Sequence, residues 1–142
     1  MPEKETLERA REDKREGKAP STQAGEFVRE EMEHIREGKH GARSTKQAIA
    51  IGLSKARRAG VDLPPSQNSS PEVKEQAERD IRKAGKKPSK RRSRATLKAL
   101  KREGHSAASK ESLSRQARAA AKKRSAASRS RSAKKAAKTR KK

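Results

Sequence analysis

The chain has 142 residues, of which 41 are Lys or Arg and 18 are Asp or Glu, so its formal net charge is +23 at pH 7. Leu, Ile, Val and Phe together number only 14, which is too few to bury an extensive core and is typical of chains with disordered regions. The sequence has no Cys, no apolar run of about 18 residues and no apolar signal region after Met1, which excludes disulfides and thiolate metal sites and leads us to expect a cytoplasmic protein.

Residues 1–20 are predicted to form a charged N-terminal arm. Pairs such as Glu5 with Arg9 favour a polar helix, and only Leu7 and Ala10 are available for apolar packing. Because a helix without an apolar face gains little from tertiary contacts, we expect this arm to fray.

Residues 21–65 are predicted to form a helical hairpin. Its first helix begins at Ser21 or Thr22 and ends at Gly38. Residues at i, i+3, i+4 spacing form its apolar face: Ala24, Phe27, Val28, Met32 and Ile35. The opposite face is expected to point to solvent and carries Arg29, Glu30, Glu33 and Glu37.

The second helix of the hairpin is predicted from Ser44, which forms a capping box with Gln47, to Gly60. Its apolar face consists of Ala48, Ile49, Gly52, Leu53 and Ala56. Cations near its two ends are candidate phosphate contacts, namely Arg43, Lys46, Lys55, Arg57 and Arg58. The alternative interpretation is an ordinary capped and solvated helix.

The core of this hairpin is small, so we expect marginal stability and a need for a homodimer mate, a protein partner or the segments that flank the hairpin. His34 and His40 are expected at its surface. A metal site needs three or four converging ligands and a core that holds them, so we expect no metal and no cofactor.

Residues 66–88 are predicted to be a linker that contains one short helix. Ser70 and Pro71 are typical of a helix start, and Gly85 is typical of a helix end. The short helix would present Val73, Ala77 and Ile81 on one side.

Residues 89–142 are predicted to form a largely disordered tail rich in Lys, Arg, Ala and Ser. From Lys86 to Lys142 the chain has 23 basic residues against two acidic ones. Helices are expected around Leu97 and around Leu113 only when phosphate cancels the repulsion between cations. The expected fold class is therefore mostly α: a small αα-hairpin, frayed flanking helices and a disordered basic tail.

A short motif recurs in the sequence. Arg-Glu-Gly-Lys occupies residues 15–18 and 36–39, and Arg-Glu-Gly-His occupies residues 102–105. We interpret the recurrence as shared helix-end chemistry.

The charge of the tail indicates a polyanionic partner, because each phosphate neutralised by Lys or Arg releases condensed counterions. The predicted nucleic-acid-binding residues are Lys86, Lys87, Lys90, Arg91, Arg92, Arg94, Lys98, Lys101, Arg102, Arg115, Arg118, Lys122, Lys123, Arg124, Arg129, Arg131, Lys134, Lys135, Arg140, Lys141 and Lys142.

The kind of nucleic acid is suggested by the missing aromatic residues. The chain has no Trp and no Tyr, and its single Phe27 is assigned to the hairpin core. Single-strand binders and the common RNA modules stack bases on aromatic side chains. We therefore expect duplex DNA, contacted through phosphates without sequence preference, and structured RNA is the alternative.

No sequence feature favours catalysis. The chain lacks a Gly-rich phosphate loop and a nucleophile elbow, and its small core offers little means of desolvating a carboxylate pair. We therefore expect that the protein is not an enzyme.

Two segments carry a family resemblance: EFVREEM at residues 26–32 and STKQAIAIGLSKARRAG at residues 44–60. Together with SRATLKALKR at 93–102 and LSRQAR at 113–118, they resemble a family of small basic bacterial proteins of unassigned function. The resemblance implies no catalytic residue and no ligand. The Lys/Ala/Ser tail is also similar to the tails of linker histones and their bacterial analogues, which implies binding to chromatin or the nucleoid.

The expected function is nonspecific duplex DNA binding by a nucleoid-associated, histone-like protein. One alternative is an RNA-associated or ribosome-associated basic protein. Another is a protein-interaction hairpin whose tail is an electrostatic tether, folded back on the acidic residues Glu26, Glu30, Glu31, Glu33 and Glu37.

Overall fold

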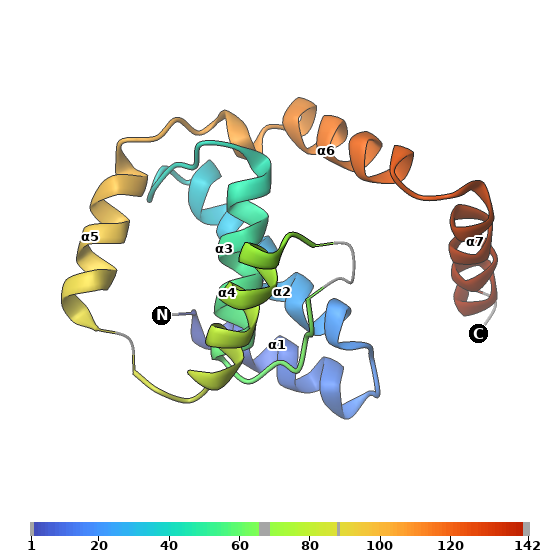
Figure 1. Cartoon of the computed structure of the whole chain (residues 1–142), viewed down its shortest axis with the longest axis horizontal. Coiled ribbons are helices and arrows are strands. Elements are labelled where there is room, and N and C mark those ends of the chain that lie inside the picture. Colours follow the sequence, from blue (N-terminus) through green and yellow to red (C-terminus); the bar gives the residue numbers. More distant parts are fainter. Residues whose placement is uncertain (1, 66–68, 88, 141–142) are drawn as a thin grey trace. The chain divides into compact units, whose positions relative to one another are not determined.

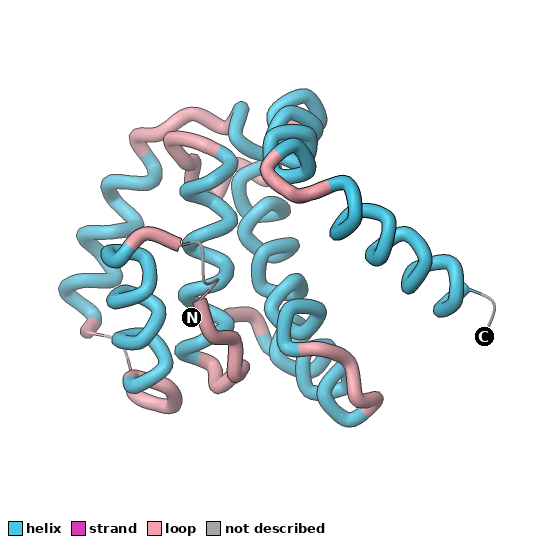
Figure 2. Tube along the Cα trace, turned by 45° about the vertical axis from the view of Figure 1, so that its right-hand side comes forward, coloured by secondary structure: helices cyan, strands magenta, loops and turns pink. Residues whose placement is uncertain are grey.

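The structure is a computed structural model that describes residues 2–65, 69–87 and 89–140, and this part of the chain is helical without strands (Figures 1 and 2). Its elements are α1 (Lys4–Arg15), α2 (Pro20–Arg36), α3 (Thr45–Arg58), α4 (Pro71–Arg82), α5 (Lys90–Lys101), the 3₁₀ helix η1 (Ser106–Ala108), α6 (Lys110–Lys122) and α7 (Ala126–Arg140). The chain divides into two units, residues 1–109 and 110–142. Within the described ranges, no helix has the length and apolar character that crossing a membrane requires.

The predicted hairpin is confirmed as α2 and α3, which pack closely against each other. Gly52 permits this approach, because a Cβ atom at this position would lie 2.7 Å from the Cα of Val28. The core contains Ala10, Ala24, Phe27, Ala56 and Val61, with the half-buried Leu7, Leu53 and Leu63 packed against it. The small side chains at the helix contact explain how so few large apolar residues suffice.

The helix starts agree with their sequence signals. At α3 the Ser44 hydroxyl accepts from the amide of Gln47 at 3.1 Å. The Gln47 side chain accepts from the amide of Arg43 at 2.6 Å, one residue earlier than in a standard capping box. At α4 the Ser70 hydroxyl accepts from the amide of Val73, with Pro71 in the first turn.

Two copies of the recurring motif end helices in the same way. Gly17 and Gly38 have φ of 75° and 79°, and the amide of the following Lys reaches back to the last turn. Gly104 in the third copy has no positive φ; its carbonyl instead accepts from the amide of Ala42 at 3.0 Å. The shared helix-end chemistry therefore applies to the first two copies only.

The prediction of a frayed N-terminal arm is wrong. Helix α1 packs on α2 and buries Thr6, Ala10 and Asp13. The expected pair of Glu5 with Arg9 is loose at 3.9 Å, because Arg9 Nε donates to Glu26 of α2 at 2.8 Å. Ion pairing to α2 and the entry of Ala10 into the core hold a helix that is polar over most of its surface.

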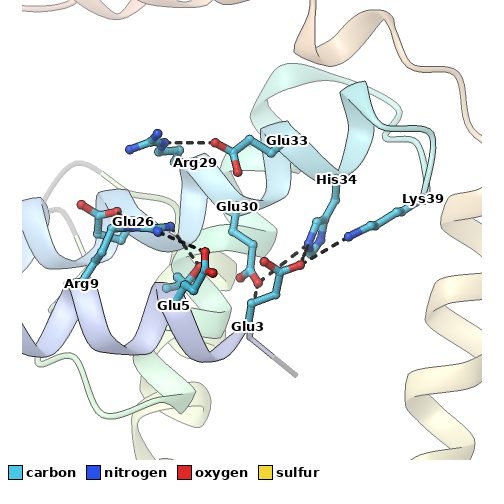
Figure 3. A network of polar contacts seen from close by, with 10 residues as sticks. Glu3, Glu5, Arg9, Glu26, Arg29, Glu30, Glu33, His34 and Lys39 are labelled. Carbon is cyan, nitrogen blue, oxygen red and sulfur yellow. Dashed lines mark hydrogen bonds and ion pairs between the residues drawn. The ribbon is translucent and has the colours of Figure 1, made fainter.

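The prediction that Glu30 and His40 lie at the surface of the hairpin is also wrong, because Glu30 is 2% exposed and His40 is 5% exposed. The start of α1 covers Glu30, whose Oε1 accepts from the amide of Glu3 at 2.6 Å. Figure 3 shows this cluster, with Glu3, Glu30 and His34 pointing toward one another. Helical periodicity within α2 could not reveal a polar face covered by a different helix.

The prediction of a disordered tail is wrong as well, since α5, α6 and α7 span most of residues 89–140. Ala, Lys and Arg are strong helix formers, and Ser residues supply the starts. The Ser89 hydroxyl accepts from the amide of Arg92, and the Ser125 hydroxyl accepts from the amide of Ser128 at 3.1 Å. The prediction gave too much weight to repulsion between cations and too little to intrinsic propensity.

The last residues of α5 and the segment that follows them, together residues 100–108, lie against the loop between α2 and α3; we refer to residues 100–108 as the docking segment. The amides of Gly41 and Ala42 donate to the carbonyls of Leu100 and Gly104 at 2.9 and 3.0 Å. A Cβ atom at Gly41 would lie 2.1 Å from the carbonyl oxygen of Glu103, so only glycine fits there.

Two side chains of the hairpin complete the attachment of the docking segment. The Thr45 hydroxyl donates to the Ala107 carbonyl at 2.6 Å, and Arg36 Nε donates to the Ala108 carbonyl at 3.0 Å. These contacts fix the C-terminal end of α5 to the hairpin.

Candidate nucleic-acid interface

Helix α5 presents a basic face. At 3.6 residues per turn, one side of this helix carries five exposed cations, namely Lys90, Arg91, Arg94, Lys98 and Lys101. Arg92 lies on the opposite side. None of the α5 residues is buried, so the basic face is open to solvent.

After its first turn, which contains Lys110 and Glu111, helix α6 has its basic and its apolar residues on different sides. Arg115, Arg118 and Lys122 share one side, at i, i+3 and i+7 spacing. The other side carries Leu113, Ala117, Ala120 and Ala121. Arg115 donates to the Ser112 hydroxyl at 3.2 Å, which leaves its guanidinium at the exposed surface.

Helix α7 has a third basic face, formed at i, i+3, i+4 and i+7 by Arg131, Lys134, Lys135 and Lys138. Arg129 and Arg140 lie on the other side. Arg124, just before the helix, donates to the hydroxyls of Ser128 and Ser132. Its side chain therefore supports the first turns of α7.

The other predicted binding residues lie in the connections. Lys86, Lys87, Arg102 and Lys123 are exposed. Lys141 and Lys142 lie outside the described residues. Sequence reasoning missed Lys110 and Lys138, although the regular spacing of Lys138 with Arg131, Lys134 and Lys135 was a signal that could have found it.

The basic residues from 86 to 140 carry unneutralised charge. Within the described residues, none of the ion pairs includes a Lys or Arg of this range. The described part of residues 2–85 differs in part, because several of its cations are paired with carboxylates: Arg9, Lys18, Arg29, Lys39, Lys55, Arg58 and Arg79. Lys39, for example, has its pKa raised by the hydrogen bonds it donates to Glu37 and Glu3.

Three of the five hairpin cations are engaged within the hairpin unit. Lys55 contacts the buried Glu31, and Arg58 Nε donates to Asp80 of α4 at 2.9 Å. Arg57 Nε donates to the Leu63 carbonyl at 2.8 Å, and burial lowers the pKa of this arginine. Their proposed role as phosphate contacts stays a prediction, and it now competes with these intramolecular bonds.

The remaining two hairpin cations, Arg43 and Lys46, are exposed at the N-terminus of α3. The amide of Gln47 is already satisfied by Ser44, and Thr45 is bound to the docking segment. These groups at the start of α3 are therefore already hydrogen-bonded within the protein. The side chains of Arg43 and Lys46 remain there as candidate phosphate contacts.

The acidic residues proposed to hold a folded-back tail also have intramolecular partners. Glu26 pairs with Arg9, Glu33 pairs with Arg29 at 3.1 Å, and Glu37 pairs with Lys39 at 3.3 Å. Glu30 and Glu31 are buried. The five carboxylates are therefore buried or already paired, although the side chains of Glu33 and Glu37 stay 44% and 57% exposed.

Comparison with known proteins supports the resemblance in part. Residues 19–67 match the model of a family of unknown function (DUF6496). The match covers α2 and α3, together with the connections on either side, and ends before the basic helices. Neither a curated protein nor a solved structure matches this chain.

Proposed function

We propose that this protein binds duplex DNA without reading its sequence, by placing the basic faces of α5, α6 and α7 against phosphates. The observation that carries the proposal is the contrast in pairing. Three of the five candidate cations of the hairpin are bonded to a carboxylate or a carbonyl, whereas no Lys or Arg from residue 86 to 140 forms an ion pair in the described chain, and many of these line one face of α5, α6 or α7. Unpaired cations in such number favour a polyanion, since counterion release drives its binding.

Helical basic faces favour duplex DNA over RNA. The major groove of B-form DNA admits an α-helix, whereas the major groove of A-form RNA is too narrow for side chains to read. The chain also lacks Trp and Tyr, and its Phe27 is 1% exposed, so it offers no aromatic platform for unpaired bases. Structured RNA remains the runner-up.

The charge distribution also argues against the tether alternative. A tail folded back on the hairpin would have to compete for the five proposed carboxylates, because three of them pair with other cations and two are buried. We propose instead that the hairpin is the compact scaffold from which α5 projects, and that the protein acts as a nucleoid-associated, histone-like component.

Salt dependence tests this proposal. If about 6 to 10 phosphates are contacted, affinity for a labelled duplex falls by about 10³ to 10⁵ between about 50 and 200 mM salt, and it changes little among scrambled duplex sequences. Fluorescence anisotropy measures both quantities. A slope near zero, or a strong preference for one sequence, would contradict phosphate binding. Competition by structured RNA at equal or higher affinity would shift the proposal to the RNA alternative.

A further inference from the structure

A buried carboxylate in the hairpin has only one of its two oxygens satisfied. Glu31 is 0% exposed, and its Oε1 is contacted by the ammonium group of Lys55. Its Oε2 lies 3.1 Å from Nε2 of His40 but has no hydrogen-bond partner. A buried carboxylate oxygen that nothing satisfies is destabilising, so an unexplained one points to a missing group.

The orientation of His40 shows what kind of group is missing. Its Nδ1 lies 2.9 Å from the Gly41 carbonyl oxygen, which can only accept, so Nδ1 carries a proton. In the neutral imidazole, Nε2 then presents a lone pair to Oε2 of Glu31. Two acceptors then face each other in a buried place, and a cation between them, either a proton on Nε2 or a metal ion, would remove the conflict.

His34 extends the same arrangement. Its Nε2 lies 3.0 Å from Oε1 of Glu3, which leaves Nδ1 as the remaining ring nitrogen (Figure 3). The rings of His34 and His40 meet edge to face, with centroids 6.0 Å apart. One ligand atom each from Glu31, His34 and His40 can be chosen so that all lie within 4.8 Å of one another.

We propose that Glu31, His34 and His40 form a binding site for a zinc-like divalent cation, with a fourth position for water or an external ligand. Two imidazole nitrogens and one carboxylate oxygen are a typical donor set for Zn²⁺. At bond lengths of about 2.0–2.2 Å, tetrahedral ligand atoms lie about 3.3–3.5 Å apart. The pair formed by His40 Nε2 and Glu31 Oε2, at 3.1 Å, is close to this spacing.

The surroundings supply the supporting contacts that such sites use. Metal-bound histidines donate their other ring N–H to a carbonyl or a carboxylate. The Gly41 carbonyl is placed to accept this hydrogen bond from His40. The Glu3 carboxylate is placed to accept it from His34. Lys55 is bonded to the other oxygen of Glu31 and leaves Oε2 unoccupied.

A second cluster of Glu3, Glu30 and His34 uses the same histidine. It offers two carboxylates, one of them exposed, and Lys39 lies 3.4 Å from Glu3. Its oxygen-rich donor set and the nearby ammonium group suit Zn²⁺ less well than two imidazoles do. We therefore assign Glu3 the supporting role.

Titration of the untagged, chelator-treated full chain with Co²⁺ and Zn²⁺ tests the site. We expect one ion per chain, the visible absorption of four-coordinate Co²⁺, its loss when Zn²⁺ displaces Co²⁺, and a higher unfolding temperature with Zn²⁺. His34→Gln and His40→Gln should weaken binding at least about 100-fold. Glu3→Gln should weaken it about 10- to 100-fold, as expected for a supporting contact.

The matched control is His105→Gln, because His105 is the third histidine and is exposed outside the cluster. Its binding should equal that of the unaltered chain. The site is refuted if the unaltered chain takes up no ion in a 1:1 complex, or if His105→Gln and His34→Gln have equal effects. His34 is less buried than His40, so His34→Gln is the less disruptive of the two changes. If far-UV circular dichroism shows that His40→Gln is unfolded, the effect of His34→Gln on metal binding tests the site.

Discussion

Gly25 in α2 has space for a methyl group, whereas Gly52 in α3 is packed against Val28. This difference leads to a stability prediction. Gly52→Ala forces a methyl group toward the backbone of Val28, so it should lower the free energy of unfolding by about 1–3 kcal/mol. At Gly25 no atom lies within 4 Å of the place that a methyl group would take, so Gly25→Ala should raise it by up to about 1 kcal/mol. Urea unfolding measures both changes. Equal effects would contradict the close packing of the two helices.

Lys18 should give a pH-dependent contribution to stability at the end of α1. Hydrogen bonds to Glu16 and Asp13 raise its pKa above the ordinary value of 10.5. Both the folded and the unfolded chain are protonated at this side chain below 10.5, so its contribution is complete there; above 10.5 only the unfolded chain loses the proton, and the contribution falls.

The test compares the unaltered chain with Lys18→Gln by urea unfolding at several pH values. The variant should be less stable, because Asp13 is buried and loses its ion pair. The difference between the two chains should stay constant from neutral pH to about 10.5 and shrink above it. A difference that stays constant above 10.5 would show that the pair is not formed.

At the scale of an element, α5 offers a comparison of two arginines in equivalent exposure. Arg94 lies on the basic face and Arg92 lies on the opposite side of the same helix. If α5 binds DNA through one face, Arg94→Gln should reduce the log-log salt slope by about 0.9, as for one lost phosphate contact. Arg92→Gln, with the same change in net charge, should leave the slope almost unchanged. Equal effects would mean that total charge matters and the helix face does not.

Individual helices could be predicted from the sequence where local signals decide them. Ser44, Ser70, Gly38 and Gly60 mark helix ends in the sequence, and the structure confirms the helices that they bound. The basic helices were missed because propensity and charge repulsion oppose each other there. The burial of Glu30 was missed because it depends on α1, which is distant in sequence.

The candidate interface was found from charge alone, but its division into faces needed the helices. No local pattern indicates that Lys55 contacts Glu31 or that Arg57 donates to Leu63, since these partners are set by tertiary packing. Gly41 and Ala42 likewise bond to the docking segment, about 60 residues later in the chain, and no local pattern indicates this contact. Local sequence therefore identified the cations and could not show which of them are already engaged.

At the scale of the whole molecule, the two units allow a truncation test. A chain that ends at Ser109 keeps the hairpin, α5 and the docking segment, so its urea midpoint should equal that of the full chain. It loses 14 of the 23 basic residues that follow Gly85, so its affinity for duplex DNA and its salt slope should both fall. Unchanged affinity would place DNA binding entirely in the first unit.

The attachment of the docking segment has a consequence for the order of folding during synthesis. Thr45 and Arg36 find their carbonyl partners 62 and 72 residues later in the chain. The ribosome adds about 5–20 residues per second, so for several seconds a newly made hairpin exposes these donors and the amide of Gly41 to water. The loop that carries His40 closes only after Ala108 has emerged, and it should exchange its amide hydrogens earlier than the centre of α2 and α3 does.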